Sequence, residues 1–158
     1  MASGARERKR EMTVQHVRGE EREDARSSVP HFGAGRRVLV AEEDNELRER
    51  LAGTLRRDGY EVIEAKDGLD LLDQIAPLLA TQQMHEPIDV IIADVRMPCF
   101  AGLEILTHLV EAERKPTVIV ISAPGDPGIR ARARRLGAIA VMDKPFDIDD
   151  LRTVLFNL

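Results

Sequence analysis

The chain has 158 residues and a formal net charge of −5 at pH 7, and 43% of its residues are hydrophobic although only 3% are aromatic. This length predicts one domain with an aliphatic core, and its single cysteine, Cys99, excludes an internal disulfide and is typical of a reducing compartment. No apolar run approaches the roughly 18 residues that span a bilayer, and the charged N-terminus lacks the apolar stretch of a secretory signal, so a soluble cytoplasmic protein is expected.

The chain begins with a charged segment whose composition differs from that of the rest. Residues 1–36 are rich in Arg and Glu and nearly devoid of Leu, Ile and Phe, so they bury too little apolar surface to offset the entropy lost on folding. We therefore predict a disordered charged tail over residues 1–36 and a folded domain over residues 37–158. A mixed-charge run of this kind is more often a solvated leader than a binding site, and Met12 is an alternative start.

From residue 37 onward, apolar stretches of two kinds alternate. Short runs rich in Val and Ile indicate strands, and longer stretches with apolar residues three or four positions apart indicate helices. Leu47, Leu51 and Leu55, for example, form one helical stripe, and Pro77 is expected to kink or end the second helix. In chain order, the predicted elements are strand 37–43, helix 44–59, strand 60–65, helix 67–79, strand 88–94, helix 102–113, strand 116–123, helix 126–137, strand 138–143 and helix 147–158.

Five strand–helix units with unbroken apolar strands predict an α/β fold, in which a doubly wound, five-stranded parallel sheet is covered on both faces by five helices. The carboxyl ends of parallel strands share one edge of the sheet, and ligands bind at that edge where the strand order reverses. The residues expected at these ends are polar. They are Glu42 and Glu43 after the first strand, Asp94 on the third, Ser122 on the fourth and Lys144 just past the fifth.

This set of groups is suited to accepting a phosphoryl group. Clustered carboxylates repel one another, and a hard divalent cation such as Mg²⁺ compensates their charge. A carboxylate beside Mg²⁺ can attack phosphorus, while the Lys144 ammonium and the Ser122 hydroxyl can neutralise the oxygens of the transferred group. The sheet edge is therefore predicted to be a phosphoryl-acceptor site.

Four stretches carry a resemblance to a known family. They are VLVAEEDNELRERL from residue 38, DVIIADVRMPCFAGLEIL from residue 89, VIVISA from residue 118 and DKPF from residue 143. In this order and spacing they resemble the receiver domain of bacterial response regulators, over about residues 37–158. The resemblance implies a flavodoxin-like fold of the CheY-like kind, with a sheet of order 2-1-3-4-5.

The resemblance also implies a role for each residue at the sheet edge. Asp94 would be the phosphoacceptor, and Ser122 would be the switch hydroxyl that follows the phosphoryl group. Lys144 would pair with that group, and its bond to Pro145 is often cis in the family. Mg²⁺ would be held by Glu42, Glu43, Asp94 and the backbone carbonyl of Arg96.

The sequence departs from the family pattern at several places, among them Cys99 and Ala101, which replace a Gly and an Asp often found before Gly102. The family's acidic pair usually contains at least one Asp, typically at the position of Glu43, whereas Glu is one methylene longer. Val141 stands where the family often has Tyr or Phe, three residues before the lysine, so an aromatic rotamer switch is not expected. The second crossover, which includes residues 77–87, is longer than usual.

Together these inferences predict a single-domain response regulator that accepts a phosphoryl group on Asp94 from a histidine kinase or histidine phosphotransfer protein. It would bind a downstream protein through the face of its fourth helix, fifth strand and fifth helix, although the four arginines there are interpreted as a solvated face. They are Arg130, Arg132, Arg134 and Arg135. Neither a membrane nor direct DNA binding is expected.

Two other functions remain as alternatives. The chain would not be an enzyme beyond slow self-phosphorylation and self-dephosphorylation, because phosphatases of the haloacid-dehalogenase type need a second Asp where this chain has Arg96. A non-phosphorylated pseudo-receiver, acting only as a protein-interaction module, is the stronger alternative. Glu43 and Val141 are the two features that favour it.

Overall fold

A computed structural model describes residues 33–158 except 80–85, 99–101, 110–111 and 113–114. Five strands form one parallel sheet of order β2-β1-β3-β4-β5, so the predicted fold class is confirmed. Most of the predicted tail, and Cys99, lie outside the described residues. The elements are β1 (Arg37–Ala41), α1 (Asn45–Arg57), β2 (Glu61–Ala65), α2 (Gly68–Leu79), β3 (Val90–Asp94), α3 (Gly102–Leu109), β4 (Thr117–Ser122), α4 (Pro127–Arg135), β5 (Ala140–Asp143) and α5 (Ile148–Phe156).

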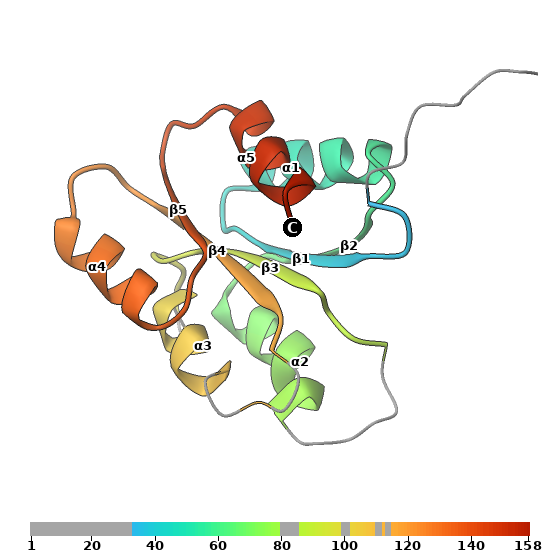
Figure 1. The fold of residues 1–158 in the computed structure, drawn as a ribbon. Helices are drawn as coiled ribbons and strands as arrows, with labels where there is room; N and C mark the ends of the chain where they lie inside the picture. The colour runs from blue at the N-terminus through green and yellow to red at the C-terminus, as the bar shows by residue number, and fades with distance from the viewer. Residues whose placement is uncertain (1–32, 80–85, 99–101, 110–111, 113–114) are drawn as a thin grey trace, which may run out of the picture.

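The helices form two layers around the sheet. Helices α1 and α5 cover one face, and α2, α3 and α4 cover the other (Figure 1). Successive residues of a strand point to opposite faces, so the central strands must be apolar at every position. In β3, for example, Ile91 packs on the side of α2 and α3 and Ile92 on the side of α1 and α5, and both are fully buried.

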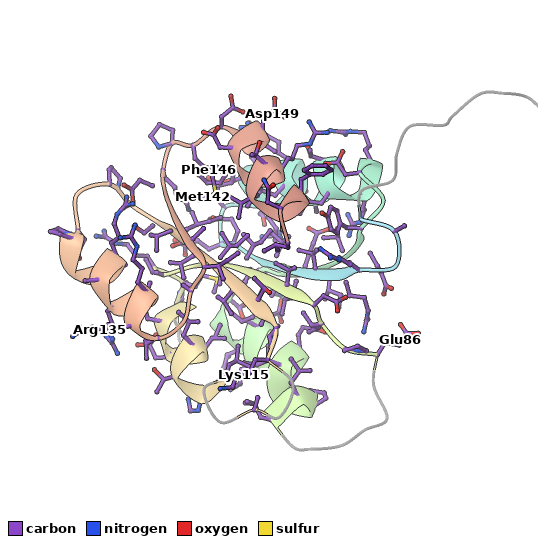
Figure 2. The ribbon with its side chains drawn as sticks, viewed as in Figure 1. Glu86, Lys115, Arg135, Met142, Phe146 and Asp149 are labelled. Carbon is purple, nitrogen blue, oxygen red and sulfur yellow. The ribbon has the colours of Figure 1, made fainter. Side chains whose placement is uncertain are left out.

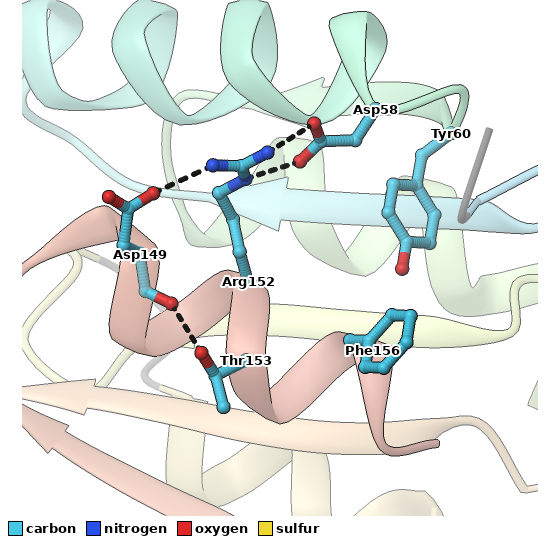
Figure 3. A pocket seen from close by; sticks show the side chains of 6 residues that line it. All are labelled: Asp58, Tyr60, Asp149, Arg152, Thr153 and Phe156. Atoms are coloured by element: carbon cyan, nitrogen blue, oxygen red, sulfur yellow. Dashed lines mark hydrogen bonds and ion pairs between the residues drawn. The ribbon is translucent and has the colours of Figure 1, made fainter. Parts of the chain in front are cut away.

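The smaller layer is held by an aliphatic core and by polar contacts at its end. Leu51 and Leu151, on α1 and α5, are fully buried against the sheet, and burial of a Leu side chain stabilises a fold by about 1.5–3 kcal/mol. Arg152 of α5 donates two hydrogen bonds, of 2.7 and 2.8 Å, to the two carboxylate oxygens of Asp58 just after α1 (Figure 3). Met142 and Phe146 lie on this same side of the sheet (Figure 2).

The backbone just before β1 packs against the ring of Tyr60. The Gly33 amide donates to the carbonyl of Asp58 over 3.1 Å, and a Cβ at position 33 would overlap the Tyr60 ring. Tyr60 also lines an open pocket of about 340 Å³ between the C-terminal end of α1 and helix α5 (Figure 3). Close approach of the backbone to the ring therefore requires glycine at position 33.

Two features of the helices bear on the predictions. Pro77 lies inside α2, which continues to Leu79, so the proline does not end the helix, although its nitrogen cannot donate a hydrogen bond to the residue four positions before it. Helix α1 begins after Asp44, whose carboxylate accepts a hydrogen bond of 3.0 Å from the amide of Leu47. Among the described residues, no helix is long and apolar enough to cross a membrane.

Candidate functional site

The register of the sheet brings the predicted carboxylates together. Ala41 at the end of β1 lies beside Ala93 of β3, and each is followed directly by an acidic residue, Glu42 and Asp94. Both acidic residues are buried: Glu42 is 0% exposed and Asp94 is 4% exposed. Charged groups that are this buried require a partner.

Lys144 is that partner. Its Nζ lies 2.5 Å from Oδ2 of Asp94 and 3.0 Å from Oε1 of Glu42, so one ammonium bridges the two carboxylates. It follows β5, and its amide donates a 2.8 Å hydrogen bond to the carbonyl of Ser122, which fixes the loop that carries it. The Lys144–Pro145 peptide bond is cis, as the family resemblance implied.

The pKa of Lys144 reflects this environment. Burial by itself lowers the pKa of the ammonium, but hydrogen bonds to Asp94 and Glu42 raise it more, and the charges of the two carboxylates act in the same direction. The pKa therefore lies above the ordinary value for lysine, and the ammonium stays charged at neutral pH.

Backbone groups hold the two carboxylates in place. Oδ1 of Asp94 accepts a 2.8 Å hydrogen bond from the amide of Arg96, and Oε1 of Glu42 accepts one of 3.1 Å from the amide of Asp44. The Arg48 guanidinium on α1 donates to the carbonyl of Glu42 over 2.8 Å. The other carboxylate oxygen of Glu42, Oε2, lies 2.8 Å from the Lys144 ammonium but is buried without a hydrogen bond.

Ser122 lies at the same edge but faces a different neighbour. It is 2% exposed, and its Oγ donates a 3.0 Å hydrogen bond to the carbonyl of Ala123. Oγ also lies 3.5 Å from Oδ1 of Asp143, the residue beside it in the register of β4 and β5. In the part of the chain described here, no hydrogen bond joins the Ser122 hydroxyl to Asp94 or to the Lys144 ammonium.

The structure thus groups some of the predicted site residues and separates others. Glu42, Asp94 and Lys144 form one cluster, whereas the Glu43 side chain is exposed and has no hydrogen bond or ion pair with that cluster among the described residues. Arg96 contributes its amide to Asp94. Consistent with this, no group of three or more His, Cys, Asp or Glu side chains that suits a metal ion occurs in the described ranges.

Two contributors at this edge were not singled out from the sequence. Asp143 was visible only as the residue before Lys144, and its place beside Ser122 follows from the strand register. Arg130, which the sequence places on a solvated face, is 39% exposed, and its guanidinium pairs with the carboxylate of Asp143. The other three arginines of α4 are exposed, and Arg135 is the last residue of that helix (Figure 2).

Comparison with known proteins identifies the family. Residues 38–156 match the family described as the response regulator receiver domain. The chain belongs to this family. It is a receiver domain of the kind found in the response regulators of two-component systems.

Individual relatives agree with this assignment. The receiver domain is 36% identical over 129 residues to the transcriptional regulatory protein PdtaR of Mycobacterium tuberculosis, which covers 81% of this chain and 56% of the relative. It is 28% identical over 116 residues to sporulation initiation phosphotransferase F of Bacillus subtilis, over 73% of this chain and 87% of the relative. This chain therefore spans only about half the length of PdtaR.

Solved structures share the fold. The receiver domain of the Francisella response regulator 1452 is 26% identical, with a TM-score of 0.65 over 77% of this chain and 97% of that chain. The family assignment and the clustered Asp94, Glu42 and Lys144 thus direct attention to one chemistry, the transfer of a phosphoryl group.

Proposed function

We propose that this receiver domain accepts a phosphoryl group on Asp94 from a phosphohistidine of a histidine kinase or a histidine phosphotransfer protein. The observation that carries the proposal is the 2.5 Å contact between Asp94 and Lys144 beside the buried Glu42. In this step a carboxylate oxygen of Asp94 bonds to phosphorus and the phosphorus–nitrogen bond of the donor breaks. The donor imidazole keeps the electron pair and takes up a proton from solvent.

The residues of the site have separate tasks in this reaction. The amide of Arg96 fixes one oxygen of Asp94, which leaves the other oxygen, now at the ammonium, to act as the nucleophile. Lys144 is positioned to follow the charge onto the phosphoryl oxygens, because its flexible stem lets the ammonium move while it stays in the same crevice. Phosphoryl transfer depends mainly on positioning and charge neutralisation of this kind.

We further propose that Glu42 and Asp94 hold Mg²⁺. Mg²⁺ commonly binds one or two carboxylates and completes its shell with water and phosphate oxygens, and two buried carboxylates share one ammonium here. The Oε2 atom of Glu42 is buried, and its contact is the 2.8 Å ion pair with the Lys144 ammonium, so a cation can take the place of that ammonium beside it. When bound, the ion would neutralise the phosphoryl oxygens. Glu43, whose side chain is exposed next to Glu42, and the backbone carbonyl of Arg96 remain the other proposed ligands.

The consequence of phosphorylation would be a change in partner binding. A phosphoryl dianion on Asp94 would attract the Ser122 hydroxyl and the Lys144 ammonium, which lie at the ends of the strands next to α4 and α5. We therefore propose that a downstream protein binds the face formed by α4, β5 and α5, and that the domain acts in the cytoplasm as a signalling module rather than as an enzyme. Neither DNA nor a membrane is a proposed partner.

A direct test uses a small-molecule phosphodonor. Incubation with phosphoramidate and Mg²⁺ should add the mass of one phosphoryl group to the intact protein, and Asp94→Asn should abolish the addition. The matched control is Asp73→Asn, which alters an exposed carboxylate on α2 and should leave labelling unchanged. EDTA should suppress labelling of the wild type. Absence of labelling in the wild type would refute the proposal and favour a pseudo-receiver that only binds partners, the function suggested by Glu43 and Val141.

A further inference from the structure

A second acidic residue borders the site next to Ser122. The register of β4 and β5 places Asp143 beside Ser122, and Oδ1 of Asp143 lies 3.5 Å from the serine Oγ. Its other oxygen, Oδ2, pairs with the guanidinium of Arg130 on α4. Asp143 is therefore shared between a buried hydroxyl at the sheet edge and a helix on the rim of the site.

The Ser122 hydroxyl has a single proton to donate. In this structure the nearer acceptor is the carbonyl of Ala123, at 3.0 Å, and Oδ1 of Asp143 is a second, more distant acceptor at 3.5 Å; Asp94 is not among the acceptors. A hydroxyl carries one O–H donor, so a strong hydrogen bond to a phosphoryl oxygen on Asp94 requires Ser122 to give up these contacts. The Ala123 carbonyl and the Asp143 carboxylate thus both compete with the phosphoryl group for this proton, and Asp143 is the one of the two that a side-chain substitution can remove.

The ion pair with Arg130 restricts movement of the Asp143 carboxylate when the Ser122 side chain rotates. The ion pair joins β5 to the first turns of α4, and both side chains are a little over one-third exposed, at 38% for Asp143 and 39% for Arg130. An ion pair at this exposure contributes little to stability. It does, however, fix the direction of the Asp143 carboxylate and so connects the Ser122 contact to α4.

We propose that Asp143 is a positioning residue that keeps the Ser122 hydroxyl turned away from Asp94. We also propose that the ion pair between Asp143 and Arg130 couples this contact to the position of α4. The inference rests on the proposed function, since it concerns the same phosphoryl-acceptor site. It implies that Asp143 opposes occupancy of the site by a phosphoryl anion. It also implies that occupancy releases the Ser122–Asp143 contact and changes the surroundings of Arg130.

The test measures binding of fluoroberyllate, a phosphoryl mimic, in the presence of Mg²⁺. Asp143→Ala should tighten the apparent Kd by about threefold to tenfold, the range set by the loss of one competing net hydrogen bond. In a Ser122→Ala background the same substitution should change the Kd by less than about twofold, because the competition no longer exists. The matched control, Asp150→Ala, removes an exposed carboxylate from α5 and should leave the Kd unchanged.

The outcomes separate this inference from the proposed function. If the wild type binds no fluoroberyllate, the phosphoryl-acceptor site itself is refuted. If the wild type binds but Asp143→Ala leaves the Kd unchanged, only the positioning role of Asp143 is refuted. The positioning role is also refuted if Asp143→Ala tightens the Kd equally in the wild-type and Ser122→Ala backgrounds, because a long-range charge effect then explains the change. Asp143→Asn, which keeps the side-chain shape, tests the same point if the alanine variant fails to fold.

The link to α4 has its own readout. The NMR signal of the Arg130 Nε–H group should shift when fluoroberyllate saturates the wild type, because the carboxylate beside it is released from Ser122. In Asp143→Ala this signal should start elsewhere and respond much less. An unchanged Arg130 signal in the wild type at saturation would overturn the connection to α4.

Discussion

Replacing Lys144 by methionine tests the electrostatic core of the site. The substitution keeps a long apolar side chain but removes the ammonium that lies within 3.0 Å of both Asp94 and Glu42. Removing one partner of a buried ion pair costs about 3–5 kcal/mol, because the other charge stays buried without compensation. Lys144 itself is 30% exposed, so water can reach part of the site; we therefore expect a loss of about 2–4 kcal/mol.

The assay is urea unfolding in EDTA, with the free energy of unfolding obtained by linear extrapolation. Lys115→Met is the matched control: it removes an exposed ammonium just before β4, at the opposite edge of the parallel sheet from Lys144, and should change stability by no more than about 0.5 kcal/mol. Mg²⁺ should restore part of the loss in Lys144→Met, because an ion that binds only the folded state stabilises it. If Lys144→Met is as stable as the control in EDTA, the ammonium does not compensate the buried carboxylates and the reasoning fails.

Three further predictions concern the rest of the domain. Gly33→Ala should lower the free energy of unfolding by about 1–3 kcal/mol, since its Cβ would overlap the Tyr60 ring; a neutral result in urea unfolding would contradict that packing. Arg152→Ala should cost roughly 1 kcal/mol or less, and less still in high salt, because the pair with Asp58 is partly exposed; a loss that does not depend on salt would argue against an electrostatic role. The pKa values of Lys144 and Tyr60 are both raised, that of Tyr60 mainly by burial. The unfolded chain therefore loses these protons first, so the contribution of these two groups to stability should be constant below about pH 10 and fall above it. A thermal-unfolding series in which stability rises with pH above about pH 10 would contradict both shifts.

Much of the fold follows from the sequence because its signals are local. A strand that is buried on both faces must be apolar at every position, so runs such as that around Ile91 and Ile92 are recognisable without a structure. Once the strands are known to be parallel, their carboxyl ends must share an edge. That rule alone places Asp94, Ser122 and Lys144 near one another, and the structure bears out this convergence.

The direction of each side chain at that edge is a different matter, and only the tertiary structure decides it. Glu42 and Glu43 are chemically identical neighbours, but the chain turns after β1 so that the first is buried against Lys144 and the second faces solvent. The pairing of Arg130 with Asp143 depends in turn on where α4 packs against the sheet. The sequence by itself determined the elements, their order and the chemical groups at the edge, because these depend on local pattern and chain connectivity. The contacts among those groups depend on atoms that are distant in the sequence, so they exist only once the helices and strands have packed.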